Sequence, residues 1–523
     1  MTAPTPEDEA KKRRTFAIIS HPDAGKTTLT EHLLLTSGAI RAAGQVKARG
    51  EARRARSDWM KIEQERGISV TSAVMTFEHA GAVFNLLDTP GHEDFSEDTY
   101  RTLTAADSAV MVIDAAKGIE AQTLKLFEVC RLRDIPIVTF INKMDREARD
   151  PFSLVDEIAE KLQLETAPMT WPLGMGLNFR GVLDLYTGDF VRFGAGDRVG
   201  RNALAGALAP DEIEKLDEDS ELVEAGLPRF DRALYREGHL TPVLFGSALK
   251  DFGVRELLSL LAENAPSPRP MAAANRVVSP GERETSGFVF KVQANMDPNH
   301  RDRVAFLRLA SGQFRRGMKL KQSGTGKQIG IHNPILFFAQ ERETVDEAWP
   351  GDIIGIPNHG VLRVGDTLSE SGAIAFTGIP NFAPEILRRV RLNDPMKQKH
   401  LSRALVSLAE EGVTQVFKPM IGANWVVGVV GALQLDVLKS RLNAEYGLDA
   451  ELDLSPYEAA RWISGKPVDL EAFLSVYRGQ AAEDRDGAPV FLAKSAWEVG
   501  YVAEKYPALG FARTRERHEV QAA

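Results

Sequence analysis

A phosphate-loop pattern near the start of the chain is the feature that most constrains its fold. It reads SHPDAGKT over residues 20–27, directly after the apolar run TFAIIS (15–20) and directly before a helix-like segment, TTLTEHLLLTSG. Strand, loop and helix in that order is the setting in which loop amides and a helix N-terminus bind phosphate. Such loops lie at the carboxyl edge of a parallel sheet, so the pattern predicts an α/β domain.

Positions within the loop have distinct expected parts in holding the phosphates. Gly25 lets the backbone approach closely, Lys26 is expected to bridge the β- and γ-phosphates, and the Thr27 hydroxyl is expected to ligate Mg²⁺. Ser20 stands where the general pattern has its first glycine, which is a departure from that pattern. The expected nucleotide-binding residues of the loop are Ser20, His21, Pro22, Asp23, Ala24, Gly25, Lys26 and Thr27.

Further apolar runs continue the alternation of strand and helix. VFNLLD (83–88), AVMVIDA (109–115) and PIVTFIN (136–142) read as buried strands, and helix-like segments lie between them. The alternation predicts a mainly parallel, doubly wound sheet. Residues 146–242 interrupt it with a strand-rich piece and an acidic helix, and the strand pattern resumes at 241–249. We therefore expect an insertion carried within the first domain.

The run Asp-Thr-Pro-Gly-His at residues 88–92 follows one of these strands. Asp88 at the strand end can hold Mg²⁺ through water, and the Gly91 amide can contact the γ-phosphate and so sense its presence. His92 then lies where an attacking water would lie, and it is the expected catalytic residue. An ordinary turn is the alternative for this run taken alone. The nucleotide-binding residues expected here are Asp88, Thr89, Pro90, Gly91 and His92.

The run Asn-Lys-Met-Asp at residues 142–145 indicates which base is bound. The Asp145 carboxylate can accept hydrogen bonds from guanine N1–H and the N2 amine, and adenine offers no such pair. Asn142 can hold guanine O6 or tie loops together, and Lys143 can lie along the base plane. The run Ser-Ala-Leu at 247–249 is expected to give a backbone N–H to O6. The base-binding residues expected are Asn142, Lys143, Met144, Asp145, Ser247, Ala248 and Leu249.

Residues 66–70, Arg-Gly-Ile-Ser-Val, lie between the phosphate loop and the second motif. A loop there can close over the γ-phosphate, with the Ser69 hydroxyl completing the Mg²⁺ shell. A plain polar loop leading into a strand is the alternative. The expected metal ligands are thus Thr27, Ser69 and Asp88, and the expected cofactors are GTP or GDP with Mg²⁺.

The second half of the chain changes in texture twice. Residues 265–284 are rich in proline and alanine and read as a linker. Short strands punctuated by glycines predict a small β-barrel over 285–378. Apolar helix faces alternating with strands predict a C-terminal α+β domain over 384–515. The expected fold is multidomain: a P-loop GTPase domain over 1–275 with an insertion at about 146–242, then the barrel and the α+β domain.

Composition narrows the classes of partner. The net charge of −9 argues against general nucleic-acid binding, DNA included, so an RNA partner would have to meet local basic patches. Candidates are residues 11–14 and the cations between 388 and 399, for which a solvated charged surface is the alternative. No run of 18 apolar residues occurs, so we expect no membrane span. A single cysteine, Cys130, excludes an internal disulfide and fits a reducing cytosol.

Taken together, the motifs resemble those of the translational GTPases. SHPDAGKTT, RGISV, DTPGHEDF, NKMD and GSAL stand in that family's order, and the insertion after NKMD resembles the one in elongation factor G. The segments FVFKVQANMDPNHRDRVAFLRLASG, FTGIPNFAPE and EEGVTQVFKP resemble the class II release factors, the bacterial peptide chain release factor three family. The resemblance covers about residues 12–515. Ser69 stands where many relatives have threonine, and it keeps the hydroxyl.

The resemblance implies a cytoplasmic, monomeric, ribosome-dependent GTPase that stimulates dissociation and recycling of class I release factors after peptide release. Its partners would be the ribosome, through rRNA and ribosomal proteins, and class I release factors. GTP would rotate the barrel and the C-terminal domain against the GTPase domain. Alternatives are another translational GTPase, translocase-like or a ribosomal protection factor, and a GTP/GDP-sensing switch acting off the ribosome. Relatives of the former kind carry further C-terminal domains, for which we expect no room in this chain.

Overall fold

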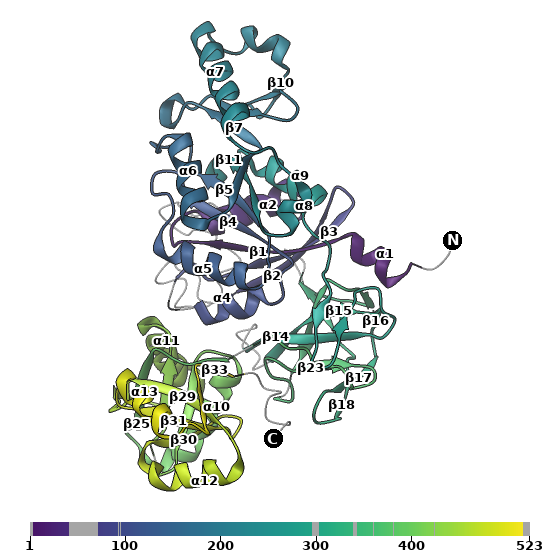
Figure 1. Cartoon of the computed structure of the whole chain (residues 1–523). Coiled ribbons are helices and arrows are strands. Elements are labelled where there is room, and N and C mark those ends of the chain that lie inside the picture. Colours follow the sequence, from purple (N-terminus) through teal and green to yellow (C-terminus); the bar gives the residue numbers. More distant parts are fainter. Residues whose placement is uncertain are drawn as a thin grey trace.

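The computed structural model describes most of the chain. The described residues are 4–40, 72–92, 94, 96–294, 303–337, 342–358, 360–379, 381–422 and 424–515. The predicted loop at 66–70, with Ser69, lies outside them. Figure 1 shows a first domain built on a mixed sheet, with a barrel and a C-terminal domain beneath it and an insertion at its opposite end.

The first domain is organised by a seven-stranded sheet. Its strand order is β2 (Ala73–His79), β3 (Ala82–Asp88), β1 (Arg13–Ser20), β4 (Ser108–Asp114), β5 (Ile137–Asn142), β11 (Leu240–Phe245) and β6 (Glu165–Pro168). Only β2 pairs antiparallel, with β3, and the other neighbours are parallel. Every residue of β4, β5 and β11 is buried, as expected of parallel strands covered on both faces. The predicted doubly wound sheet is confirmed.

Helices cover both faces of this sheet (Figure 1). They are α2 (Lys26–Thr36), α8 (Arg232–Arg236) and α9 (Val254–Asn264), and α4 (Ser96–Leu103), α5 (Ala121–Leu132) and α6 (Pro151–Leu162). Leu29 and Leu33 of α2 share one apolar cluster with Phe16 of β1. Leu126 of α5 joins a different cluster with Ile19, whose side chain points the other way. Side chains on the two faces of β1 thus pack into two different apolar clusters.

The insertion is narrower than the predicted 146–242. The helix α6 packs against the first domain and β6 pairs with β11 inside the main sheet, so both belong to it. After β6 the chain leaves the sheet and forms a small antiparallel one. That sheet contains β10 (Arg198–Val199), β9 (Phe190–Arg192), β8 (Gly181–Asp184) and β7 (Thr170–Leu173), and it is followed by α7 (Pro210–Gly226). A four-residue strand such as β6 is too short to show a period in the sequence.

The barrel is an eight-stranded antiparallel sheet. Its order is β18 (Gln328–Gly330), β17 (Lys319–Gln322), β23 (Thr367–Ser369), β14 (Ser286–Ala294), β15 (Arg303–Ser311), β22 (Ile353–Pro357), β19 (Ile335–Phe337) and β20 (Arg342–Thr344). A separate pair joins β16 (Phe314–Arg315) to β21 (Glu347–Ala348). Phe288, Phe290 and Phe306 are fully or almost fully buried. The predicted β-domain is therefore present, and these side chains belong to an apolar cluster that continues into the first domain.

The C-terminal domain is an antiparallel sheet with helices, as predicted. The strand order is β28 (Ala450–Leu454), β25 (Ile386–Leu392), β27 (Val426–Val429), β26 (Gln415–Pro419), β30 (Ala481–Asp484), β31 (Pro489–Ala493), β29 (Ala459–Ser464) and β32 (Gly510–Ala512). Its helices are α10 (Gln398–Glu410), α11 (Ala432–Tyr446), α12 (Pro467–Val476) and α13 (Ala496–Lys505). Leu401, Leu405 and Leu408 of α10 are all buried, so one apolar helix face packs on the sheet.

Short elements complete the description. They are α1 (Pro6–Lys11), the pair β12 (Met271–Ala272) and β13 (Val277–Val278), and the pair β24 (Asn381–Phe382) and β33 (Thr514–Arg515). Among the described residues, the structure contains no helix that is both long and apolar enough to cross a membrane.

Candidate nucleotide site

The predicted motifs meet at one edge of the main sheet. The phosphate loop follows β1, Asp88 ends β3, Asn142 ends β5 and Ser247 follows β11. Because these strands are parallel, their carboxyl ends lie side by side. This is the edge at which open α/β sheets bind ligands.

Close packing explains why the phosphate loop contains glycine at position 25. Gly25 is the residue before α2, and its φ of 101° lies in the left-handed region. A Cβ there would lie 2.3 Å from the Asn142 Nδ2 atom, which donates a hydrogen bond to the Ala24 carbonyl at 2.8 Å. A larger residue would therefore push the loop away from β5. The backbone of the phosphate loop at Gly25 thus packs directly against the base motif.

Lys26 and Asp88 lie together at the centre of this edge. The Lys26 Nζ donates to Asp88 Oδ1 at 2.6 Å, and the side chains are only 6% and 1% exposed. Within the described residues, the other carboxylate oxygen of Asp88 and the Ser20 hydroxyl are buried without hydrogen-bond partners. Orphaned buried oxygens are costly, and they mark a place where a ligand completes the bonding. The arrangement fits a phosphate at Lys26 and a hard cation at Asp88.

The run from Asp88 to His92 combines structural and exposed groups. The Thr89 hydroxyl donates to the Ile18 carbonyl at 2.7 Å, so this side chain fixes the turn. A Cβ on Gly91 would lie 3.7 Å from the Pro22 Cα, which places Gly91 against the phosphate loop. The His92 ring is one-third exposed, and its Nδ1 accepts from the Asp94 amide at 3.3 Å. A neutral ring bonded in this way carries its proton on Nε2.

The base motif is tied together by Asn142. Its Oδ1 accepts from the backbone amides of Lys143 and Ala248, each at 2.8 Å, and its Nδ2 reaches Ala24. Of the two parts that the sequence leaves open for Asn142, the structure thus shows the tying of loops. The Ser247 hydroxyl donates to Asp145 Oδ1 at 2.6 Å, and this bond orients the carboxylate.

Other predicted base-binding residues take different positions. The Met144 side chain is fully buried in the apolar core, so only its backbone belongs to the site. Leu249 is 55% exposed at the surface. The Lys143 Nζ donates to the Asp23 carbonyl and lies 2.7 Å from Asp114 Oδ2.

Sequence reasoning missed Asp114 as a member of this edge. Burial alone would raise the pKa of Asp114, but the hydrogen bond from Lys143 and the amide of Ala116 outweigh it and hold that pKa below its ordinary value. Asp114 therefore stays charged and fixes the Lys143 stem across the base site. The sequence could have indicated Asp114, because this residue ends β4 and β4 ends at the same edge of the sheet as β3 and β5.

His21 belongs to the loop but is directed toward α5. Its Nε2 lies 3.2 Å from the carboxylate of Glu120, the residue that precedes α5. This contact orients the loop from the side away from α2. It supports the view that the His21 side chain serves the turn.

The predicted basic patches are partly neutralised. Arg391 pairs with Asp453 at 2.9 Å, and Lys11 pairs with Glu7 at the same distance. Arg388 and Arg389 are adjacent in β25, so their side chains point to opposite faces of the sheet. The cations near residue 390 therefore do not form one surface.

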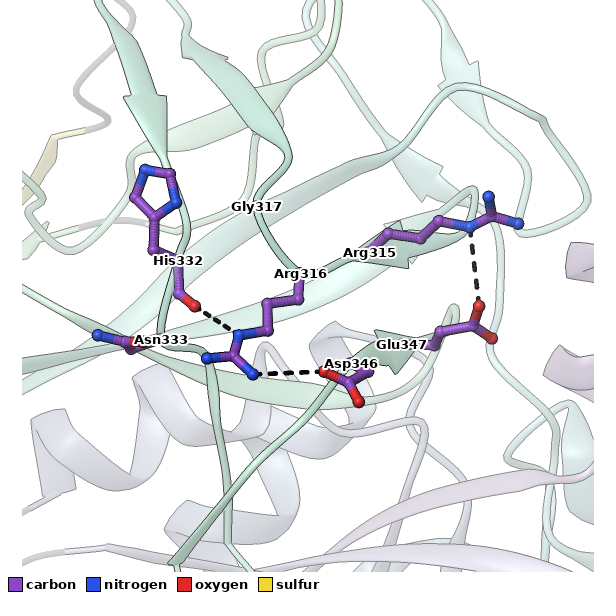
Figure 2. A pocket seen from close by; sticks show the side chains of 7 residues that line it. All are labelled: Arg315, Arg316, Gly317, His332, Asn333, Asp346 and Glu347. Carbon is purple, nitrogen blue, oxygen red and sulfur yellow. Dashed lines mark hydrogen bonds and ion pairs between the residues drawn. The ribbon is translucent and has the colours of Figure 1, made fainter.

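A separate hollow lies on the barrel (Figure 2). It is lined by Arg315, Arg316, Gly317, His332, Asn333, Asp346 and Glu347. Arg316 donates to the His332 carbonyl at 2.9 Å and pairs with Asp346 at 3.6 Å. These exposed pairs satisfy one another and contribute little to stability.

Comparison with known proteins follows the same three-part division. The elongation factor Tu GTP-binding domain family matches residues 11–267, and elongation factor G domain 2 matches residues 284–371. The C-terminal domain of the class II release factor RF3 matches residues 376–503.

A crystal structure of a protein from Thermus thermophilus shares the fold. It is 24% identical, with a TM-score of 0.69, over 87% of this chain and 71% of that one. The family matches run in the order expected for a translation factor and cover each part of the architecture described above. The chain is a translational GTPase whose C-terminal domain is that of the class II release factors.

Proposed function

We propose that this protein is a cytoplasmic, ribosome-dependent GTPase that dissociates class I release factors from the ribosome after peptide release. The observation that carries the proposal is that one chain combines two features. A sheet edge has the residues expected to bind a guanine nucleotide, and residues 376–503 match the C-terminal domain of a release factor. The edge supplies a carboxylate, Asp145, oriented by Ser247. Within the described residues, an orphaned oxygen on Asp88 lies on the same edge, beside Lys26.

The residues of the site divide the chemistry among them. The loop amides and Lys26 bind the β- and γ-phosphates, and Asp145 selects guanine, since an adenine would leave that carboxylate unpaired. Mg²⁺, when bound by Thr27, Asp88 and the Ser69 hydroxyl, supplies charge neutralisation at the phosphate oxygens. His92 orients the attacking water, while Gly91 senses the γ-phosphate through its amide.

The partly exposed His92 ring is the group whose role is most directly tested by mutation. We expect His92→Ala to reduce ribosome-stimulated GTP turnover about a hundredfold, since positioned acid–base groups contribute on that order, with GTP affinity nearly unchanged. His239→Ala is the matched control, because His239 is exposed and precedes β11 at the opposite edge of the sheet. Full turnover in His92→Ala would refute the assigned role.

Two assays decide the biological step. The first measures GTP hydrolysis with and without ribosomes, and the second measures multiple-turnover peptide release by a class I release factor. We expect ribosomes to stimulate hydrolysis and the protein to speed release-factor turnover. Stimulation of tRNA movement would instead identify a translocase-like factor. Absence of any ribosome effect would favour a switch that acts off the ribosome.

A further inference from the structure

We propose that Asp94 is a positioning residue that holds His92 through its backbone amide and caps helix α11 of the C-terminal domain with its carboxylate. Docking of that domain and the resting position of His92 would then be one equilibrium. The inference rests on the proposed function, because it assigns a control to the hydrolysis that His92 supports.

The first observation is a helix cap supplied by another domain. The α11 helix begins at Ala432, and the residue before it, Gly431, has no side chain with which to bond the free amides of the first turn. The Leu433 amide instead donates to Asp94 Oδ2 at 2.6 Å. A carboxylate is the favoured partner at this end of a helix, both as a hydrogen-bond acceptor and as a charge opposite to the helix dipole.

The helix's own side chains leave this amide to Asp94. The Gln434 Oε1 accepts from the amides of Val430 and Gly431, at 2.7 Å and 3.3 Å, which precede the helix. Gln434 thus accepts hydrogen bonds from the backbone that precedes α11, and Asp94 accepts one from the first turn of α11. The Leu433 amide of the first turn therefore has this partner only while the two domains are docked.

The second observation is independent of hydrogen bonding. A Cβ on Gly431 would lie 2.1 Å from the Asp94 Cγ and 2.4 Å from its Cα. The φ of Gly431 is −134°, which any residue adopts without strain. Glycine is therefore needed here because Asp94 approaches so closely, and the two surfaces are fitted to each other.

The third observation joins His92 to the backbone of the same residue. The His92 Nδ1 lies 3.7 Å from Asp94 Oδ1 and accepts from the Asp94 amide at 3.3 Å. The backbone amide of Asp94 thus bonds His92, and its carboxylate bonds the Leu433 amide of α11. A shift of His92 toward a γ-phosphate drags the Asp94 backbone with it, so the cap on α11 is strained or lost.

The consequence is reciprocal control. A docked C-terminal domain holds the His92 loop and suppresses hydrolysis, and undocking frees it. By linkage, the arrangement of His92 that favours hydrolysis also favours undocking. Since a bond to a charged group is about twice as strong as a neutral one, we expect the latch to hold back turnover about tenfold.

The test uses two variants that break the latch from opposite domains. Gly431→Ala inserts a methyl group into Asp94, and Asp94→Ala removes the cap without any clash, so it stays informative if the first variant folds poorly. Gly500→Ala is the matched control, because a Cβ there meets no atom within 4 Å and the residue lies in α13 of the same domain. GTP turnover without ribosomes is measured in full-length protein, with kcat and KM separated.

We expect both latch variants to raise ribosome-free kcat about tenfold with little change in KM, and Gly500→Ala to match the wild type. Asp94→Asn keeps an oxygen acceptor and should retain most of the suppression. The rise must vanish when His92→Ala is added, a dependence that a merely structural role would not produce.

An unchanged ribosome-free kcat in both latch variants would overturn the proposal, as would a rise that survives His92→Ala. Failure of the latch and failure of the proposed function are distinguishable. If wild-type protein is stimulated by ribosomes and His92→Ala is not, the proposed function stands whatever the latch variants do. If ribosomes never stimulate wild-type protein, the function itself fails.

Discussion

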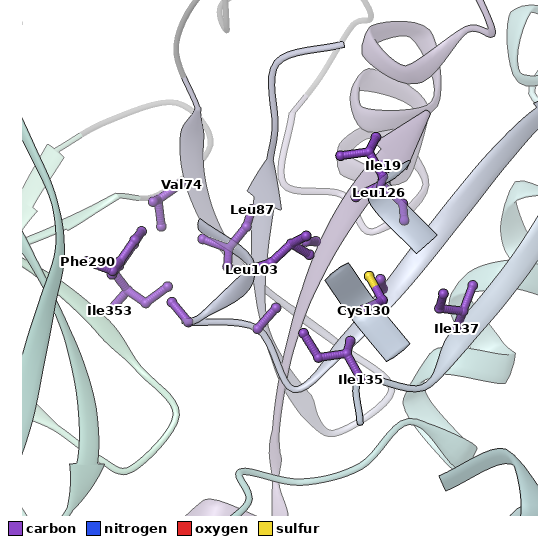
Figure 3. Packing of buried hydrophobic residues seen from close by; sticks show 14 of the residues in the cluster. Ile19, Val74, Leu87, Leu103, Leu126, Cys130, Ile135, Ile137, Phe290 and Ile353 are labelled. Carbon is purple, nitrogen blue, oxygen red and sulfur yellow. The ribbon is translucent and has the colours of Figure 1, made fainter. Parts of the chain in front are cut away.

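The first domain meets its two neighbours through interfaces of opposite character. Toward the barrel it continues its own apolar core, in which Val74, Leu87 and Leu103 join Phe290 and Ile353 (Figure 3). Strand β14 packs against α4, and β19 packs against β2. Because these side chains belong to one buried cluster, the two domains share a hydrophobic interior there.

Toward the C-terminal domain the contacts are mainly polar and incompletely bonded, with one aromatic contact between Tyr100 and Phe382. Gln415 Nε2 lies 3.4 Å from Glu97, Arg101 lies 3.4 Å from Asn381, and Asp94 caps α11. Within the described part of the chain, the Arg101 Nε and Gln415 Oε1 atoms are buried without partners. A small hollow between the domains is lined by both residues.

The difference indicates which interface opens at lower cost. Separating the barrel from the first domain costs a free energy of about 25 cal/mol for each Å² of apolar surface that becomes exposed. The polar groups of the other interface instead regain hydrogen bonds to water when that interface opens. The C-terminal domain is also joined to the barrel by ion pairs, such as Arg303–Glu410 at 3.0 Å. On the cost of exposed apolar surface, we expect the interface between the first domain and the C-terminal domain to open before the barrel interface, although these ion pairs hold the C-terminal domain to the barrel.

The largest expected effect comes from opening the shared apolar core. Phe290 is fully buried in β14, and Phe290→Ala should lower the free energy of unfolding by about 3–5 kcal/mol through lost burial and a cavity. Urea denaturation measures the change. Phe473→Ala, in the separate core of the C-terminal domain, is the control that should spare the first domain and barrel. A loss under about 1 kcal/mol for Phe290→Ala would mean that the barrel is not anchored by this core.

A buried ion pair within the same interface comes next. Arg308 pairs with Asp107 and donates to the Thr15 hydroxyl at 2.6 Å, and its side chain is almost fully buried. Arg308→Met leaves Asp107 without this partner and should cost about 3 kcal/mol in the same denaturation experiment. Adding Asp107→Asn should recover part of the loss, since it removes the stranded charge. Strict additivity of the two changes would show that the pair is not coupled.

Acid should weaken the barrel interface through Asp98. Burial raises the pKa of Asp98, but Lys291 of the barrel and the hydrogen bonds from Ser72 outweigh it and lower that pKa below its ordinary value of 3.8. A lowered pKa gives stability that is present above the ordinary pKa and lost as pH falls through the folded-state value. Asp98→Asn should lower stability at pH 7 by about 1–2 kcal/mol and flatten the acid limb of the stability profile. Parallel profiles for the variant and wild type would rule out the assignment.

The smallest effect is expected at the polar interface. Gln415 donates to the Phe382 carbonyl, and its Oε1 is unpartnered among the described residues. Gln415→Leu should change the free energy of unfolding by less than about 1 kcal/mol, since the bond to the Phe382 carbonyl and the long contact with Glu97 are exchanged for apolar packing. The same denaturation experiment measures it. A loss as large as that of Phe290→Ala would erase the contrast between the two interfaces.

Local patterns predicted most of the first domain. The apolar runs that became β1, β3, β4 and β5 are long, buried and parallel, so hydrophobicity alone reports them. Their order also places the motifs at one edge, which is why the nucleotide residues could be named before the structure. The leucines of α10 gave an equally clear helical period.

Features that depend on distant residues could not be predicted. β6 is recognised only by its pairing with β11, more than seventy residues later in the chain, as Thr166 faces Thr241. Asp94 and Gly431 lie far apart in sequence, and the residues around neither of them predict that Asp94 caps α11. The place of Asp114 at the binding edge follows from its position at the end of a parallel strand. Its ion pair with Lys143 could be found only in the folded structure. Ser69 remains a prediction outside the described residues.

The measurement that tests the account most directly is nucleotide binding by calorimetry, comparing GTP with ATP on wild type and Asp145→Asn. An oriented carboxylate at position 145 should make wild type prefer GTP over ATP by at least about a thousandfold, since the wrong base leaves a polar group unpaired. Asp145→Asn should weaken GTP and favour xanthosine triphosphate, whose C2 oxygen accepts from the new amide. Equal binding of ATP and GTP to wild type would contradict the account.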